Sequence, residues 1–445
     1  MGNELFTRRA LTRLLIPIII EQVLAVSVGM ADTIMVSSLG ESAVSSVSLV
    51  DNINILLIQI FTALASGGAV IAAQYIGRGD QKNANTAAKQ LMYSSLFITL
   101  IITALSLIFN NQILHSIYRE LEPDVMSNAV IYYYITALSY PFLAIYNACA
   151  GLFRAMGNSK VTMYISILIN VINITGNAIL IYGLHFGVEG AAIPTLLSRV
   201  VGAVIMIVLI RHKDNKIYIE KLLKPEIDFK MINRILKIGV PNGLENGMFQ
   251  IGKLLVAGMI ASFGTASIAA NAVAGSITGM AMIPGSAIGI AMITVVGQCV
   301  GAGEYEQASK YTKRLMAIMF GAMGVLNLIL FIVAPPFVRF YNISEGASKT
   351  AVGILRIYAV MTATVWPLSF GLPNALRASG DAKFTMVVSI MSMWVFRIGF
   401  SYLLVYMFHL ELHGVWFAMY IDWIVRSVIL VTRFLRGKWK SIRVI

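Results

Sequence analysis

Two ten-residue stretches, RAMGNSKVTM at Arg154–Met163 and RASGDAKFTM at Arg377–Met386, share the phrase R-A-x-G-x-x-K-x-T-M. A second phrase, Q-x-x-G-x-G followed by an acid, occurs at Gln74–Asp80 and again at Gln298–Glu304. Single residues recur 224 positions apart, namely Pro17 with Pro241, Glu21 with Glu245, and Gly40 with Gly264. The chain is therefore predicted to be a duplication in which the two phrases mark equivalent turns.

The composition is that of a membrane protein. Of the 445 residues, 58% are hydrophobic and 12% are charged, and the mean hydropathy is +0.78. Soluble domains carry roughly 25% charged residues, so a soluble protein is disfavoured. The net charge of +13 does not indicate a nucleic-acid partner, because the cations gather in particular loops between apolar runs.

Twelve apolar runs are long enough to cross a bilayer, whose hydrocarbon core of ~30 Å needs about 20 helical residues. The first six are Leu14–Val36, Ile53–Tyr75, Leu91–Phe109, Val130–Leu152, Val161–Tyr182 and Gly190–Ile210. The second six are Ile235–Ile260, Ile268–Cys299, Leu315–Pro335, Val352–Leu372, Phe384–Val405 and Val415–Phe434. The sequence therefore predicts an all-α polytopic membrane protein with an N-lobe at residues 1–215, a cytoplasmic linker at 216–234 and a C-lobe at 235–445.

Lysine and arginine are concentrated on one side of the predicted membrane. The loops assigned to the outer side hold only Arg119, Arg339 and Lys349. Because cytoplasmic loops carry the excess of Lys and Arg, both termini are expected in the cytoplasm, where the Arg and Lys of the R-A-x-G phrase hold each loop. Six spans per half make the halves parallel repeats, which favours two lobes that rock in alternating access. A channel is disfavoured, because no filter-like loop interrupts a span.

The sequence contains no recognisable enzyme motif. A Walker loop, H-E-x-x-H and G-x-S-x-G are all absent, and Q-x-x-G-x-G lacks the third glycine of a dinucleotide fingerprint. Cys149 and Cys299 lie in apolar runs, and we interpret them as buried small side chains, not as a disulfide or zinc ligands. Neither catalysis nor an organic cofactor is expected.

A candidate ion site lies on the first, fifth and sixth spans. Asp32 is deep in the first span, where a charge is costly and usually faces a cavity or a partner. Asn173 and Asn177 are four residues apart and share a face of the fifth span, and Thr195 lies on the sixth. One carboxylate among amide and hydroxyl oxygens could hold a proton or a sodium ion. The alternative is a hydrated Asp32 near the outer end of its span.

A second set of residues is predicted to contact a substrate from the C-lobe, and its members are Glu245, Lys253, Met280, Trp366 and Arg397. Glu245 and Lys253 are eight residues apart and are not neighbours on one helix face. Glu245 has a hydrated inner vestibule as its alternative. Lys253 could be a counter-ion for Asp32 or a binder of an anionic substrate, and Met280 could simply fill a gap between helices.

Other residues in or beside the spans have simpler interpretations. Asp422 and Arg426, spaced i, i+4, are expected to pair. Asp51 is expected at the membrane interface, Arg199 to extend toward it, and Tyr132–Tyr134 to form an interfacial aromatic belt. Small residues expected to allow close helix approach in the eighth span are Gly275, Gly279, Gly285 and Gly289.

The twelve-span duplication, the two paired phrases and ADTIMVSSLGESAV at the end of the first span together resemble the bacterial multidrug and toxic-compound extrusion (MATE) transporters. The resemblance covers almost the whole chain. It implies two six-helix lobes around a V-shaped central cleft, and antiport of cationic or amphipathic compounds against H⁺ or Na⁺. It also implies monomeric function among the lipids of the bacterial inner (cytoplasmic) membrane.

The resemblance further implies where ions bind. N-lobe sites in related proteins use an Asp on the first helix, an Asn and an Asp on the fifth, and a Thr on the sixth, which correspond here to Asp32, Asn173, Asn177 and Thr195. Asn177 replaces the second acid, so one carboxylate remains. Another branch uses a Glu on the seventh helix and an Asp on the tenth. Here Glu245 lies about one turn earlier, and Trp366 stands near the tenth-helix position.

Three functions are therefore weighed. A cation-coupled multidrug exporter comes first. A flippase or exporter of a lipid-linked or anionic natural product, in the same superfamily, is favoured by the cations Lys253 and Arg397. A membrane-embedded transferase comes third, because it needs a long loop with acid or histidine chemistry and the outer loops are of ordinary connector length.

Overall fold

A computed structural model describes residues 4–118, 121–220, 222, 224, 226–341 and 343–445, and all regular secondary structure in them is helical. Contacts divide the chain into two compact units, Phe6–Gly243 and Leu244–Val444, apart from a few terminal residues. The division falls inside helix α9, Phe229–Ala261, which begins within the linker predicted at 216–234. Arg119, one of the predicted outer-loop cations, lies outside the described residues.

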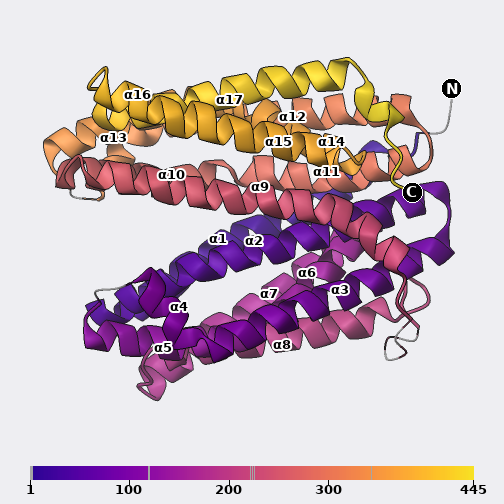
Figure 1. Cartoon of the computed structure of the whole chain (residues 1–445), viewed down its shortest axis with the longest axis horizontal. Coiled ribbons are helices and arrows are strands. Elements are labelled where there is room, and N and C mark those ends of the chain that lie inside the picture. The colour runs from indigo at the N-terminus through magenta and orange to yellow at the C-terminus, as the bar shows by residue number, and fades with distance from the viewer. Residues whose placement is uncertain (1–3, 119–120, 221, 223, 225, 342) are drawn as a thin grey trace. The chain divides into compact units, whose positions relative to one another are not determined.

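The N-terminal unit consists of helices that run alongside one another (Figure 1). They are α1 Arg8–Ser37, α2 Glu41–Arg78, α3 Gln81–Ile108, α4 Asn110–Ile117, α5 Pro123–Leu138, α6 Tyr140–Ala155, α7 Ser159–Asn177, the π-helical turn η1 Ala178–Gly183, α8 Glu189–Ile210 and the start of α9 Phe229–Ala261. The short α4 was not predicted from the sequence.

The C-terminal unit continues from α9 and is also a bundle of adjacent helices (Figure 1). Its elements are α10 Thr265–Ala281, α11 Ile283–Gly301, α12 Tyr305–Arg339, α13 Glu345–Thr364, the π-turn η2 Pro367–Gly371, α14 Leu372–Ala378, α15 Ala382–Ser392, the π-turn η3 Met393–Gly399, α16 Phe400–Tyr406, α17 Glu411–Leu435 and the 3₁₀ turn η4 Lys438–Ser441.

Every predicted span coincides with a helix or with consecutive helices, which confirms the all-α polytopic fold. Among the described residues, nine helices are long and apolar enough to cross a membrane, and two bent pairs, α5 with α6 and α13 with the following Pro367–Ala378, also qualify if each is one span. The predicted seventh span coincides with α9, which is 33 residues long but carries Lys230, Arg234, Lys237, Glu245 and Lys253. Three of these charged residues, Lys237, Glu245 and Lys253, lie within the predicted seventh span.

Several spans are broken at identifiable residues. α5 meets α6 at 44° next to Pro141, and α13 meets the next segment at 56° just before Pro367. Proline lacks an N–H donor and clashes with the preceding turn, so both breaks have a local cause. The π-turn η1 directly follows Asn177, and the π-turn η3 contains Arg397. Such turns frequently occur at functional sites.

The repeated R-A-x-G phrases close tight turns, as predicted. Gly157 and Gly380 have φ angles of +82° and +100°, a conformation that glycine adopts without strain. The arginine of each phrase also has a partner that the sequence did not predict. Arg154 donates to Glu21 at 2.6 Å in the N-terminal unit, and Arg377 donates to Glu245 at 2.7 Å in the C-terminal unit. Each arginine thus ties its turn to the first helix of its repeat.

Small residues allow close packing at only some of the predicted positions. A Cβ at Gly285 of α11 would lie 2.2 Å from Trp366, and one at Gly289 would lie 2.6 Å from the Asn374 amide. Gly275 and Gly279 of α10 have no other atom within 4 Å of such a Cβ. Close approach is therefore a property of α11, and the prediction for α10 is wrong.

Candidate functional site

The four residues of the predicted ion site form one chain of hydrogen bonds in the N-terminal unit. The Asn177 amide on α7 donates to Asp32 Oδ1 on α1 at 2.7 Å. The same amide lies 3.5 Å from Asn173 Oδ1, and Asn173 donates to Thr195 Oγ1 on α8 at 2.9 Å. Asp32 is partly exposed, whereas both asparagines are buried. Three helices thus contribute polar groups to one place.

The packing of α7 on α8 explains why these groups meet. A Cβ at Gly176 would lie 2.7 Å from the ring of Pro194, so only glycine allows this approach. Gly176 lies between Asn173 and Asn177, and Pro194 precedes Thr195. The close contact between the two helices therefore brings the amides of α7 to the hydroxyl of α8.

One oxygen in this network has no partner. Asn177 Oδ1 is buried and accepts no hydrogen bond within the described residues. An unsatisfied buried acceptor is costly, and a second acceptor, Asp32 Oδ1, lies on the other side of the same amide. Carboxylate, amide and hydroxyl oxygens are hard ligands suited to a proton or a small hard cation. No group of three or more His, Cys, Asp or Glu that could hold a metal is found in the described part of the chain.

Charged and aromatic residues that sequence reasoning placed elsewhere adjoin this network. Asp51 Oδ1 accepts from the Asn54 amide at 3.2 Å and from the Tyr132 hydroxyl at 3.4 Å. Arg199 donates to Ser139 Oγ at 2.6 Å, at the bend between α5 and α6. Asp51 and Arg199 both interact electrostatically with Asp32. The structure therefore gives Asp51 and Arg199 protein partners that the sequence did not predict, and their expected places near the membrane surface stay predictions.

The predicted aromatic belt is also wrong for two of its three tyrosines. Tyr132 and Tyr133 are only 7% and 1% exposed, and the Tyr133 hydroxyl donates to Ser106 at 3.0 Å. Tyr134 alone is exposed, at 49%. The sequence signal for this inward-facing side is the Asp51-x-x-Asn54 spacing, which puts two polar groups on one face of α2. Asp51 accepts from Tyr132 on α5, and Asn54 accepts from Tyr140 on α6 at 2.6 Å.

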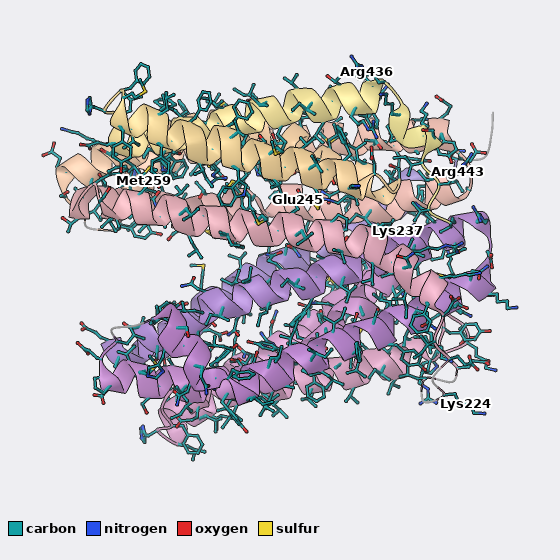
Figure 2. All side chains as sticks on the ribbon, in the orientation of Figure 1. Lys224, Lys237, Glu245, Met259, Arg436 and Arg443 are labelled. Atoms are coloured by element: carbon teal, nitrogen blue, oxygen red, sulfur yellow. The ribbon has the colours of Figure 1, made fainter. Side chains whose placement is uncertain are left out.

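Glu245, a predicted substrate contact, lies midway along α9 (Figure 2). Its side chain is 10% exposed, and its carboxylate pairs with Arg377, which also donates to Asn374 at 3.2 Å. Glu245 Oε2 has no partner among the described residues. Glu21, its equivalent in the other half, uses both oxygens, because Thr162 donates to Glu21 Oε2 at 3.0 Å.

Three further predicted residues gather around two phenylalanines in the C-terminal unit. Lys253 Nζ lies 5.4 Å from the centroid of the Phe249 ring, and Arg397 Cζ lies 5.2 Å from the same centroid. Phe249 meets Phe370 edge to face at 6.2 Å, and Trp366 stacks on Phe370 at 5.4 Å. The structure therefore brings Lys253, Arg397 and Trp366 into one cluster.

The remaining predictions for the C-terminal unit have mixed outcomes. Met280 on α10 is 48% exposed, and no described contact joins it to the cluster. The predicted pairing of Asp422 with Arg426 is confirmed, with an N–O distance of 3.3 Å. Both cysteines are buried, as expected, and neither forms a disulfide.

Comparison with known proteins gives a consistent match. The MatE family model matches residues 17–179 and 241–403, once in each half. The probable multidrug resistance protein NorM of Thermotoga maritima is 27% identical over 446 residues, covering 98% of this chain and 93% of that protein. The uncharacterized transporter YisQ of Bacillus subtilis is also 27% identical, over 435 residues, covering 95% and 93% of the two chains.

A solved structure shares the fold across the whole chain. It is a MOP superfamily transporter from Pyrococcus furiosus, for which the reverse polarity of the binding pocket suggests a different function. It superimposes with a TM-score of 0.90 at 23% identity and covers 98% of this chain and 97% of its own. At this identity the likeness concerns the fold.

Proposed function

Because the chain belongs to the MatE family of multidrug and toxic-compound extrusion transporters, we propose that it exports cationic or amphipathic organic compounds by antiport against protons or sodium ions. The ion binds at Asp32 of the N-terminal unit. The observation that carries this proposal is the hydrogen-bond chain from Asp32 through Asn177 and Asn173 to Thr195. NorM of Thermotoga maritima, a probable multidrug resistance protein, supports the drug-export part.

The site couples ion binding to the arrangement of three helices. A proton on Asp32 removes the charge that attracts the Asn177 amide, and weakens a hydrogen bond that joins α1 to α7. A sodium ion instead recruits Asp32 together with the unpartnered Asn177 Oδ1 and keeps the carboxylate ionised. Either ion changes the link between α1 and α7, and two-state helix arrangements of this kind are what alternating access requires.

The energy available is sufficient for export. One elementary charge that crosses ~100 mV releases ~2.3 kcal/mol, which supports about a 50-fold gradient of a neutral compound. The protein is proposed to work in the cytoplasmic membrane of a bacterium with both termini inside. This orientation follows from the distribution of Lys and Arg over the loops.

The first test uses purified protein in liposomes loaded with a cationic dye, with a sodium gradient and a pH gradient imposed in separate experiments. Wild type is expected to release dye in response to one of the gradients, and Asp32→Asn is expected to lose that response about 100-fold. Asp124→Asn, which changes an exposed Asp in the first turn of α5, is the matched control and should transport normally. An Asp32→Asn protein with wild-type gradient dependence would remove Asp32 from the mechanism.

A second variant tests the single-carboxylate character of the site. Asn177→Asp places an acid beside Asp32, where two like charges attract a cation more strongly than one. The concentration of sodium ions or protons that gives half-maximal dye release should shift about tenfold. An unchanged ion dependence in a folded variant would show that position 177 does not face the coupling ion.

The second candidate function is transport of an anionic or lipid-linked compound. Lys253 and Arg397, which lie against one ring, favour it, and the transporter from Pyrococcus furiosus with reverse polarity in its binding pocket offers a precedent within the superfamily. Folded protein that releases no cationic dye under either gradient, but moves a labelled anionic lipid between leaflets, would establish this function in place of the first.

A further inference from the structure

Lys253 and Arg397 approach the same phenylalanine from different helices. Lys253 lies one turn after Phe249 on α9, and Arg397 comes from the π-turn η3. Both charged groups lie just over 5 Å from the ring centroid, at 5.4 and 5.2 Å. This is within the range of a cation–π contact. Arg397 is also close enough to Lys253 to repel it electrostatically. Two like charges thus lie close together within predicted spans.

No acid in the described residues pairs with either cation. Arg397 interacts electrostatically with Asp422, but Asp422 already pairs with Arg426 at 3.3 Å and accepts a hydrogen bond from Ser392 at 2.5 Å. Three cations therefore share one carboxylate, so the cluster is left with two positive charges in excess. Charges inside a membrane normally have a partner or face a ligand pathway.

Arg426 shows how this unit holds a cation that has a structural role. It is 2% exposed, pairs with Asp422, donates to the Ser389 carbonyl at 3.4 Å and lies over the Phe370 ring. By contrast, Lys253 is exposed, and both Arg397 and Phe249 are partly exposed. The side chains of Lys253 and Arg397 make no hydrogen bond in the described part of the chain. Their charges are therefore not neutralised by the protein groups that the structure describes.

The backbone around the two cations is packed closely. A Cβ at Gly252 would lie 2.2 Å from Met393 Cε and 3.4 Å from Ile398 Cδ1, so α9 packs against η3 at this glycine. Gly252 immediately precedes Lys253, and Met393 and Ile398 lie on either side of Arg397 along η3. The packing of α9 on η3 therefore brings the helix segments that carry the two cations together.

An aromatic surface continues from the two charges. Phe249 contacts Phe370 edge to face at 6.2 Å, and Phe370 stacks on Trp366 with their planes 22° apart. Trp366 fits because Gly285 of α11 has no side chain. Phe370 is only partly buried. The cluster therefore offers an apolar face beside its cationic end.

We propose that Lys253, Arg397 and Phe249 form a binding subsite for the anionic group of an amphiphile, a carboxylate, sulfonate or phosphate attached to an aromatic or other apolar body. The anion neutralises the two cations, and the apolar body lies against Phe249 and Phe370. The subsite rests on the proposed export of amphipathic compounds and defines one class of them: amphiphiles with an anionic or zwitterionic group. A purely cationic compound is repelled there, so the cationic dye of the transport assay has to bind outside this subsite.

The test measures equilibrium binding of three probes that share one ring system and differ in charge: 1-pyrenesulfonate, 1-pyrenemethanol and 1-pyrenemethylammonium. Full-length protein is held in phosphatidylcholine nanodiscs without an ion gradient, and empty discs correct for partition into lipid. We expect the sulfonate to bind at least tenfold more tightly than the other two. Lys253→Gln and Arg397→Gln should each weaken sulfonate binding about tenfold, and the double variant should bind all three probes alike.

Arg356→Gln is the matched control. Arg356 is an exposed arginine of the same unit that lies 5.4 Å from the Phe331 ring, a geometry close to that of Arg397. It should bind the sulfonate like wild type. Arg397→Lys, which keeps the charge, should retain most of the affinity and shows that the site still folds. Equal binding of the three probes to wild type, or equal losses in Arg356→Gln and Arg397→Gln, would overturn the proposal.

A repeat in discs that contain phosphatidylglycerol distinguishes the sources of the anion. If this lipid displaces the sulfonate from wild type, the bound group is a lipid headgroup. If the sulfonate still binds, the site selects an amphiphile that is not a membrane lipid. Both results support the anion subsite. Because the binding assay uses no ion gradient, Asp32→Asn should bind the sulfonate like wild type. A negative result in the binding assay would therefore overturn the anion subsite alone. Ion coupling at Asp32 is tested separately by dye release from liposomes.

Discussion

In the N-terminal half, the first and fifth spans meet through an acid and two amides, Asp32 with Asn173 and Asn177. In the C-terminal half, the corresponding spans are α9 and α15 with its η3 extension, and they carry Lys253 and Arg397. The position 224 residues after Asp32 is Val256, and the position 224 residues after Asn173 is Arg397. A duplicated scaffold thus carries opposite charge at equivalent helices, and the two sites proposed above, for the coupling ion and for an anion, lie in different halves.

The duplication also retains a feature in both halves. Glu21 pairs with Arg154 in the first half, and Glu245 pairs with Arg377 in the second. The two arginines belong to the repeated R-A-x-G phrases. The glutamate–arginine pair, which both repeats keep, therefore ties each turn to the first helix of its repeat. The charged groups that differ between the repeats lie farther along the chain. The comparison separates residues that hold the fold from residues that are free to specialise.

The largest predicted effect comes from breaking the shared ion pair. Glu21→Gln should destabilise the protein by about 3–5 kcal/mol, because it leaves Arg154 without its buried counter-charge. Glu245→Gln should cost less, since Glu245 Oε2 has no partner, whereas Glu21 uses both oxygens. Thermal unfolding in detergent measures both. The double variant Glu21→Gln/Arg154→Gln should recover part of the loss, and a larger effect at Glu245 would contradict the difference between the halves.

A smaller effect is expected from a contact that only the first half needs. A Cβ at Gly67 of α2 would lie 2.7 Å from the Gly239 nitrogen and from the Ile235 carbonyl oxygen of α9. Backbone cannot yield as a flexible side chain does, so Gly67→Ala should cost about 1–3 kcal/mol. The residue 224 positions later is already alanine, Ala291.

The reciprocal change at Ala291 provides the control. Ala291→Gly removes a methyl group and should cost only the helix penalty of glycine, about 0.5–1 kcal/mol, plus a small packing loss. The same unfolding assay applies. If Gly67→Ala and Ala291→Gly prove equally mild, the close approach of α2 to α9 does not limit stability.

The fold was predictable because membrane spans follow from local sequence. A run of about 20 apolar residues predicts a helix wherever it occurs, and the repeated phrases at Arg154 and Arg377 fixed the register of the duplication. The breaks were not predicted. The η1 and η3 turns have no proline of their own, and such local widening depends on the neighbouring helices.

The candidate ion site was partly predictable for a related reason. Asn173 and Asn177 share a helix face by spacing alone, but Asp51 and Arg199 join the network through the packing of different helices. Because Asp51 and Arg199 are near the ends of their predicted spans in the sequence, both were expected near the membrane surface. Burial by a neighbouring helix, as at Tyr132 and Tyr133, cannot be read from one helix, since it depends on which helices become adjacent.

The smallest predicted effect concerns the second repeated phrase and depends on pH. Asp80 is the N-cap of α3 and accepts from the Asn83 backbone nitrogen at 3.0 Å, whereas Glu304, its repeat equivalent, makes no such bond at α12. Asp80→Ala should cost at most about 1 kcal/mol, because the cap is partly exposed to solvent, and Glu304→Ala should cost nothing measurable. Glu304→Asp should instead stabilise α12 slightly, since the shorter side chain reaches the cap position.

The sign of the pH dependence follows from the cap. Hydrogen bonds from the Asn83 side chain and then its backbone hold the pKa of Asp80 below its ordinary value. The cap therefore stabilises the folded protein above the ordinary aspartate pKa of about 3.9 and is lost as pH falls through the lowered value. The difference in melting temperature between wild type and Asp80→Ala should shrink as pH falls below about 4. If the difference in melting temperature stays constant with pH, Asp80 acts through the shape of its side chain and not through its charge. The contrast with Glu304 would then concern side-chain length alone.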